Sequence, residues 1–144
     1  KVSAVAVLCV PPTRKGVRLY FRLYAEADIR APQIIAFLRH LARALRAPCL
    51  LLWDRLNAHR AHRTRDFLLT QVRLHTCFFP SYAPELNPVE YVWSYLKTNP
   101  LANLAYFDLP SLAASTRHHA RHLQHCPDLL RSFVQHSPLF SRLT

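Results

Sequence analysis

The spacing of hydrophobic residues changes along the chain, and each spacing predicts one kind of element. Residues 2–10 and 17–25 are rich in β-branched and aromatic side chains, and residues 11–16 between them have the composition of a turn. We therefore expect an antiparallel hairpin. From Pro32, apolar residues recur at helical spacing, which predicts an amphipathic helix that ends before Pro48.

The middle of the chain alternates apolar runs with a helical stretch. Residues 49–53 and 74–79 are short, nearly continuous apolar runs, typical of strands covered on both faces. Residues 59–72 between them have a helical pattern, and residues 80–86 form a Pro-rich loop. A strand, a helix and a second strand in this order predict parallel pairing and place the chain in the α/β class.

The last third of the chain is predicted to be helical, with helices from Pro88, over residues 109–125 and over residues 128–136. With 144 residues, 51% hydrophobic and 19% charged, we expect one compact domain over 1–144, of which 105–144 form a C-terminal helical tail. The apolar runs are shorter than the ~20 residues that a membrane span needs, so we expect a cytoplasmic protein.

Composition narrows the function. Lys and Arg number 19 against 8 acidic residues, a net charge of +11, which favours a polyanionic partner. The single glycine excludes Gly-rich phosphate loops and dinucleotide-binding motifs. The four cysteines form no C-x-x-C pair, and we interpret them as reduced core residues. Trp53 and Trp93 are likewise expected in the core.

Two carboxylates stand where a site is expected. Asp54 directly follows the apolar run 49–53, and ligands of open α/β sheets bind at the carboxyl ends of parallel strands. Its alternative role is to begin a loop or cap a helix. Glu90 ends the segment 87–90, which also fits a helix capping box, but it lies beside Lys97 along the edge of the apolar stripe. Both carboxylates can converge on divalent cations that prefer oxygen ligands, of which Mg²⁺ is the first choice.

The segments around these carboxylates, LLWDRLNAHRAHRTR and FFPSYAPELNPVEYVWSYLK, resemble the DDE transposases of bacterial insertion sequences in the mariner-like superfamily. In that family the second catalytic Asp ends a strand and a His follows five positions later, as Asp54 and His59 do here. The catalytic Glu lies in a Pro-x-Tyr-x-Pro-x-Leu-Asn-Pro-x-Glu segment followed by Trp and Lys, which matches residues 80–97. Residues 101–104 and 129–140 also look similar.

The resemblance implies a ribonuclease-H-like mixed sheet with flanking helices. It also implies a transposase catalytic domain that cleaves and joins DNA, at transposon ends and at the target, with Mg²⁺ or Mn²⁺ held by three carboxylates. Asp54 and Glu90 are two of these, catalytic and metal-binding. The family's first Asp lies on a first, central strand, for which we find no counterpart here.

We therefore expect a domain that lacks its first strand, which an upstream segment or a homodimer partner would supply. Glu26 and Asp28 are alternative ligands, or else loop and capping residues. The alternative function is that of a truncated, non-catalytic transposase remnant that at most binds DNA non-specifically through its charge.

Basic residues after Asp54 and on the helix of Glu90 are expected to contact DNA, in a protein associated with the nucleoid. These are His59, Arg60, Arg63, Arg65 and Lys97. A second basic stripe is interpreted as a solvated helix face; it consists of Arg39, Arg43 and Arg46. Three histidines of the tail have a spacing that suits zinc or an ordinary exposed face: His118, His122 and His125.

Overall fold

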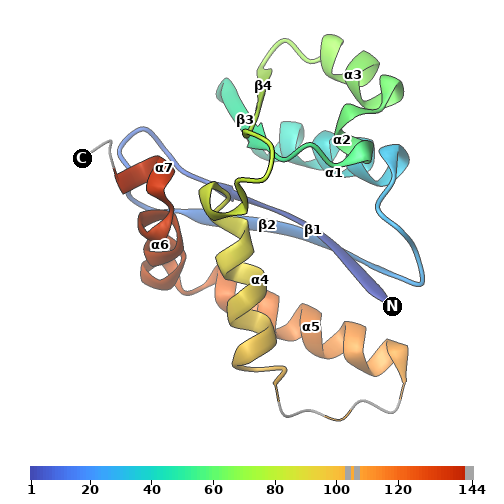
Figure 1. The fold of residues 1–144 in the computed structure, drawn as a ribbon, viewed down its shortest axis with the longest axis vertical. Coiled ribbons are helices and arrows are strands. Elements are labelled where there is room, and N and C mark those ends of the chain that lie inside the picture. The colour runs from blue at the N-terminus through green and yellow to red at the C-terminus, as the bar shows by residue number, and fades with distance from the viewer. Residues whose placement is uncertain (103–104, 106–107, 142–144) are drawn as a thin grey trace. The chain divides into compact units, whose positions relative to one another are not determined.

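A computed structural model of the chain describes residues 1–102, 105 and 108–141 (Figure 1). Its strands are β1 (Val2–Cys9), β2 (Arg18–Ala25), β3 (Cys49–Trp53) and β4 (Leu74–Phe78). Its helices are α1 (Ala31–Ala44), α2 (Asn57–Arg60), α3 (His62–Leu69), the 3-10 helix η1 (Pro84–Leu86), α4 (Val89–Thr98), α5 (Leu109–Gln124), α6 (Pro127–His136) and α7 (Pro138–Ser141). The segment 101–104 and the tail 105–144 extend into residues 103–104, 106–107 and 142–144, which lie outside the described residues.

The chain divides into two compact units. The first unit comprises residues 1–27 and 85–144, and the second unit comprises residues 28–84. The antiparallel hairpin β1–β2 is the sheet of the first unit, and the parallel pair β3–β4 is the sheet of the second. The predicted α/β class and the predicted parallel pairing are confirmed.

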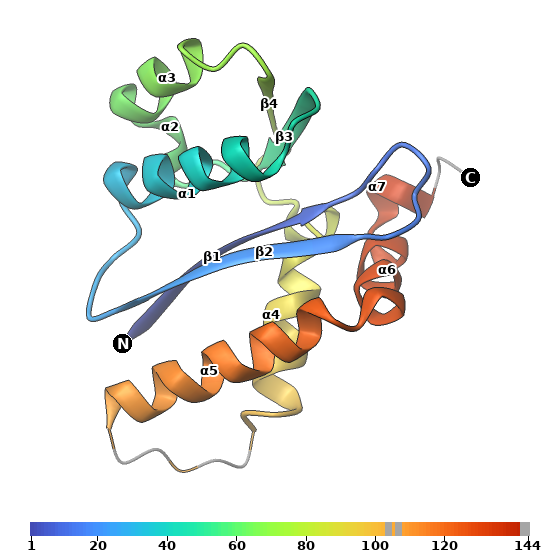
Figure 2. The ribbon, with the colours of Figure 1, turned by 180° about the vertical axis from the view of Figure 1, so that it is seen from behind.

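The hairpin of the first unit forms as its sequence predicts. Val2 pairs with Ala25 at the open end and Cys9 pairs with Arg18 next to the turn. Within the turn, Gly16 has a φ of 71°, a conformation that glycine adopts without steric cost. Helices α4, α5 and α6 pack with the hairpin (Figure 2). Their shared core consists of Val17, Leu19, Val92, Leu96, Ala120, Leu123, Leu130, Phe133 and Val134.

The second unit combines α1, α2 and α3 with the parallel pair. Helix α1 buries the apolar stripe that its spacing predicts, namely Ile34, Phe37, Leu38 and Leu41. It packs against α2 and α3, and the guanidinium of Arg39 lies 5.4 Å from the ring centre of Phe67 on α3. Arg39 is therefore a packing residue as well as a member of the basic stripe.

The expectation that both strands of this pair are covered on both faces is wrong. In β3, Leu51 and Trp53 are buried, but Leu50 is 62% exposed. In β4 only Leu74 is buried. Successive side chains of a strand point to opposite faces, and a continuous apolar run does not report which face its neighbours cover.

The cysteines differ from the prediction in burial. No disulfide joins the cysteines of the described residues, but Cys77 is exposed and Cys9, Cys49 and Cys126 are only partly buried. Burial nevertheless raises the pKa of the Cys9 thiol, while the nearby Arg18 opposes this shift. The thiols are thus at the margins of the core rather than inside it.

The helix expected over residues 59–72 is interrupted. Ala61 has an extended ψ of 141° and separates α2 from α3, which ends at Leu69. The buried hydroxyl of Thr64 donates to the carbonyl oxygen of Ala58 at 2.7 Å. This bond replaces the helical partner that the Ala58 carbonyl loses at the break, so the interruption is stabilised.

Candidate active site

Asp54 lies at the carboxyl end of β3, directly after Trp53. Its Oδ1 accepts a hydrogen bond from the backbone N–H of Leu56 at 2.9 Å and a second from Nδ1 of His59 at 2.7 Å. The same His59 nitrogen lies 3.2 Å from the backbone oxygen of Asp54. Oδ1 accepts both of the hydrogen bonds to this carboxylate, and Oδ2 has no hydrogen-bond partner among the described residues.

His59 is fixed from a second side by stacking. Its ring lies 4.5 Å from the ring of Trp53 at an interplanar angle of 15°, and Trp53 in turn stacks on Phe78 at 5.9 Å and 17°. The side chain of His59 is only 12% exposed, whereas that of Asp54 is 54% exposed. The aromatic stack therefore holds the imidazole in the orientation in which it donates to the carboxylate.

These hydrogen bonds lower the pKa of Asp54 below its ordinary value of 3.8. The bond from His59 is the main cause, the Leu56 N–H and the charge of His59 contribute in the same direction, and partial burial opposes them. Asp54 is thus an oriented carboxylate that stays ionised at neutral pH. The alternative role of a loop-starting residue is also fulfilled, because Asp54 accepts the Leu56 N–H within its own loop.

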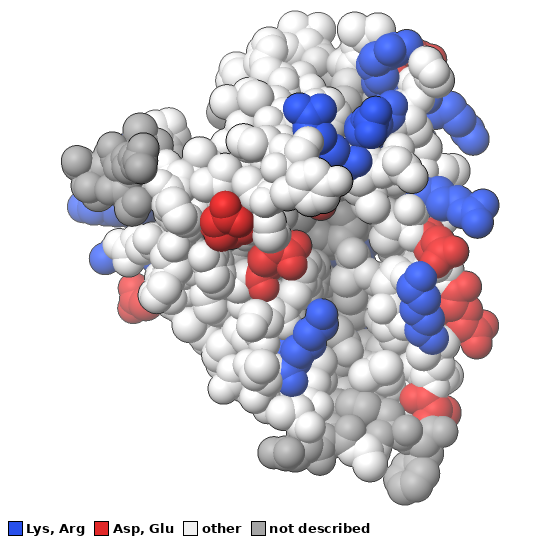
Figure 3. Space-filling model, viewed as in Figure 1, with Lys and Arg blue, Asp and Glu red and all other residues white. Residues whose placement is uncertain are grey.

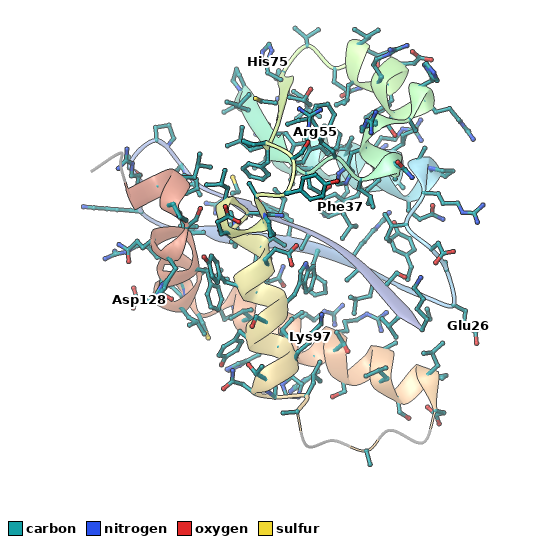
Figure 4. All side chains as sticks on the ribbon, in the orientation of Figure 1. Glu26, Phe37, Arg55, His75, Lys97 and Asp128 are labelled. Carbon is teal, nitrogen blue, oxygen red and sulfur yellow. The ribbon has the colours of Figure 1, made fainter. Side chains whose placement is uncertain are left out.

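Arg55 joins the ends of the two parallel strands, and sequence reasoning did not single it out. Its Nε donates to the carbonyl oxygen of Phe79 at 3.4 Å, and its guanidinium lies 5.6 Å from the ring centre of Phe78. Figure 4 shows Arg55 at the end of β3. The only signal in the sequence was its position next to Asp54.

Glu90 lies in the first turn of α4 in the first unit. The Oδ1 of Asn87 accepts the Val89 N–H at 3.2 Å, which caps the helix from one side. The reciprocal bond of a capping box is absent among the described residues, because the exposed Glu90 carboxylate has no hydrogen-bond partner there. The Glu90 carboxylate is therefore available to bind a metal ion, which was the alternative to a capping role for this residue.

Lys97 lies near the end of α4, as Figure 4 shows, and follows Glu90 by two helical turns. It lines a groove of about 370 Å³ between the hairpin, α4 and α5. Trp93, expected in the core, is only partly buried and lines the same groove. Trp53, by contrast, is 7% exposed, so the core prediction is confirmed for that residue.

Basic side chains gather over α2 and α3 of the second unit (Figure 3). Arg60, Arg63 and Arg65 are all exposed there, and Arg65 contacts His62 with a nitrogen-to-nitrogen distance of 2.9 Å. Exposed guanidinium groups of this kind are able to contact phosphates. His59 differs from them, because its hydrogen bond to Asp54 already engages one ring nitrogen.

The remaining candidates are Glu26, Asp28 and the tail histidines. Glu26 and Asp28 are exposed residues after β2, and Glu26 has a left-handed φ of 57°. Within the part of the chain that the structure describes, no group of three or more His, Cys, Asp or Glu side chains able to hold a metal ion occurs. The zinc alternative for the tail histidines therefore has no support from the described residues. No described helix is long and apolar enough to cross a membrane.

A family profile described as DDE superfamily endonuclease matches residues 13–112, more than half of the chain and a range that contains Asp54 and Glu90. The chain belongs to this family. Among curated proteins none matches significantly. The predicted membership in the DDE family is therefore confirmed.

Solved structures of a transposase catalytic domain are similar to this chain in fold. The catalytic domain of the Mos1 mariner transposase has a TM-score of 0.66 at 18% identity, over 98% of this chain and 77% of that one. The same domain with raltegravir and Mn has a TM-score of 0.67 at 18% identity, over 98% and 78%. With raltegravir and Mg the TM-score is 0.55 at 18% identity, over 94% and 83%. The expected ribonuclease-H-like class of the transposase catalytic domain is thus confirmed.

The donor groups of Asp54 and Glu90 suit a hard divalent cation. Asp54 offers a free carboxylate oxygen with a lowered pKa, and Glu90 offers an exposed carboxylate without a partner in the described residues. Carboxylate oxygens are the ligands that Mg²⁺ and Mn²⁺ prefer. Each carboxylate is defined within its own unit, Asp54 in the second and Glu90 in the first.

Proposed function

We propose that this chain is a transposase catalytic domain, of the kind that cleaves and joins DNA strands, with Asp54 and Glu90 as two of the three carboxylate ligands of Mg²⁺ or Mn²⁺ that the family resemblance implies. The observation that carries the proposal is the arrangement at Asp54. A carboxylate at a strand end is held by a histidine five positions later, and that histidine is fixed by an aromatic stack. Family membership supplies the endonuclease chemistry that such a carboxylate would serve.

Each residue has a separate task in this proposal. His59 donates to one oxygen of Asp54 and leaves the other oxygen for the cation. A bound metal pair would supply activation of water or a 3′-hydroxyl and stabilisation of the leaving oxygen. Arg60, Arg63, Arg65 and Lys97 would neutralise phosphates of the bound DNA.

The metal site is tested by iron-mediated cleavage of the protein backbone. Fe²⁺ replaces Mg²⁺ at carboxylate sites, and peroxide then generates radicals that cut the chain next to the ion. We expect cuts close to Asp54 and Glu90 that excess Mn²⁺ suppresses. Asp54→Asn or Glu90→Gln should abolish both sets of cuts, because the two residues share the ion.

Glu85→Gln is the matched control, since Glu85 is an exposed carboxylate near Glu90 in sequence. It should leave the pattern of cuts unchanged. Cuts that persist in Asp54→Asn, or cuts next to Asp54 without any next to Glu90, would contradict the proposed pair of ligands.

A further inference from the structure

A further basic surface lies in the first unit, and its lining includes neither Asp54 nor Glu90. It is a groove of about 330 Å³ between β2 and α5, both of which are seen in Figure 2. Its lining consists of Phe21, Arg22, Leu23, Arg117, Arg121 and Gln124. Sequence analysis assigned no role to its three arginines.

The groove is built by two elements that are fixed to each other. Helix α5 packs on β2 through Ala120 and Leu123, which belong to the core of the first unit. On the groove side, Gln124 Nε2 donates to the carbonyl oxygen of Leu19 in β2 at 2.8 Å. The arginines therefore project from a rigid base and not from a loop.

The charge of this groove is uncompensated. Arg22, Arg117 and Arg121 are exposed, and its lining contains no acidic residue. Among the described residues, none of the three forms an ion pair. Three like charges around one groove repel each other, so the arrangement favours an anionic ligand with several charges.

The spacing of the arginines suits a nucleic acid strand. Arg117 and Arg121 are one helical turn apart, which is about 6 Å along the axis of α5. Successive phosphates of one DNA strand advance about 3.4 Å along the duplex axis, so this separation corresponds to about two phosphate steps, and the two guanidiniums can reach phosphates of one strand. Guanidinium groups also match phosphate oxygens with two parallel hydrogen bonds.

We propose that the groove of Arg22, Arg117 and Arg121 binds the phosphate backbone of DNA, as a contact surface additional to the one around Asp54. This inference rests on the proposed function, because that function makes DNA the substrate. Without base-reading groups in the lining, the groove would contribute affinity and position rather than sequence preference.

The test compares two variants with the same change of charge. One is Arg22→Gln/Arg117→Gln/Arg121→Gln, and the other is Arg39→Gln/Arg43→Gln/Arg46→Gln on α1. Fluorescence anisotropy with a labelled duplex, repeated over a series of salt concentrations, gives the slope of log K against log salt. Thermal unfolding of each variant confirms that it is folded.

The groove variant should reduce the magnitude of this slope by about 3, one for each lost phosphate contact. The α1 variant should change it by less than about 1, because its three exposed side chains belong to the stripe interpreted as a solvated helix face; loss of the Arg39 contact with Phe67 would register in the thermal unfolding. An equal reduction in both variants, or none in the groove variant, would overturn the proposal. So would a groove variant that loses binding to poly-glutamate but keeps its affinity for DNA, which would assign the groove to an acidic protein segment.

DNA binding and iron-mediated cleavage together distinguish failure of the proposed function from failure of the groove proposal. If the unsubstituted chain binds no DNA, then the proposed function and the groove both fail. If DNA binding depends on the groove but iron-mediated cleavage shows no site at Asp54, only the metal assignment fails.

Discussion

Asp54 shows how one side chain is prepared for chemistry by its neighbours. Its carboxylate is more than half exposed, so solvent alone would leave it with an ordinary pKa and free rotation. The hydrogen bond from His59 lowers this pKa and fixes the orientation of the carboxylate, and Trp53 holds His59 in place by stacking. The orientation of this carboxylate therefore depends on a chain of contacts within the second unit.

Replacement of His59 by Phe should raise the pKa of Asp54 toward 3.8, because the ring stays on Trp53 while the donor is lost. The depressed pKa stabilises the folded state above pH 3.8, and this contribution is lost as the pH falls through the folded-state pKa. NMR titration of the side-chain carboxyl carbons measures the change. Asp108, whose pKa is lowered by its bond to Ser111, is an internal control and should not move.

Trp53 presents the opposite situation, a polar atom without a partner. Its indole Nε1 is buried and has no hydrogen-bond partner among the described residues. We expect Trp53→Phe to change the free energy of unfolding by less than about 1.5 kcal/mol, because removal of an unpaired donor offsets the lost packing. Trp53→Ala should cost about 3 to 5 kcal/mol. Urea unfolding compares the two variants, and equal losses would contradict this prediction.

At the scale of elements, the break between α2 and α3 determines which arginines of this segment are exposed. An unbroken helix over residues 59–72 would continue the direction of α2 beyond Ala61. Instead, α3 begins at His62 and exposes Arg63 and Arg65. The bond from Thr64 to Ala58 satisfies a buried carbonyl at this break.

Thr64→Val should therefore cost about 1 to 3 kcal/mol, since it keeps the shape of the side chain but leaves the Ala58 carbonyl unpaired. Thr70→Val is the matched control, because the hydroxyl of Thr70 also donates to a carbonyl but is exposed. Its effect should stay within about 0.5 kcal/mol. Chemical denaturation of both variants gives the difference. A harmless Thr64→Val would show that the break does not need this bond.

At the scale of the whole molecule, the sheets are small for a chain of 144 residues. The described strands form two sheets of two strands each, so every strand has one edge without a partner there. Exposed strand edges are templates for association, and two-stranded sheets have little stability of their own. We expect a polypeptide of residues 1–144 to aggregate as its concentration rises, which light scattering measures.

Catalysis by the same polypeptide is expected to be absent. The family resemblance implies three carboxylates, and Asp54 with Glu90 accounts for two. A nicking assay with supercoiled DNA and Mg²⁺ or Mn²⁺ should show no cleavage above that of Asp54→Asn. Robust cleavage that Asp54→Asn abolishes would contradict this prediction and would assign the third ligand to Glu26, Asp28 or a second copy.

DNA binding by residues 1–144 should survive this loss of catalysis. The net charge of +11 predicts an affinity that falls steeply with salt, by about 0.9 in log K per unit of log salt for each phosphate contact. Filter binding with scrambled and terminal-repeat duplexes should show similar affinities, since contacts to phosphates carry no sequence information. A strong preference for one duplex would contradict the prediction.

The sequence by itself determined the local features of this protein. Alternation and β-branched residues predicted the hairpin, helical spacing predicted α1 and α5, and an apolar run ending in Asp54 predicted a carboxylate at a strand end. The motifs around Asp54 and Glu90 together indicated the family, which the family profile confirmed. These features depend on residues a few positions apart, whose geometry is fixed by the periods of strands and helices.

Only the tertiary structure decided which surfaces are covered and which distant residues meet. The apolar run of β3 gave no indication that Leu50 is exposed, and no spacing indicated the break at Ala61. Arg22 meets Arg117 across one groove because α5 packs on β2, although the two residues are far apart in sequence. Such contacts depend on the packing of whole elements, and local periodicity carries no information about that packing.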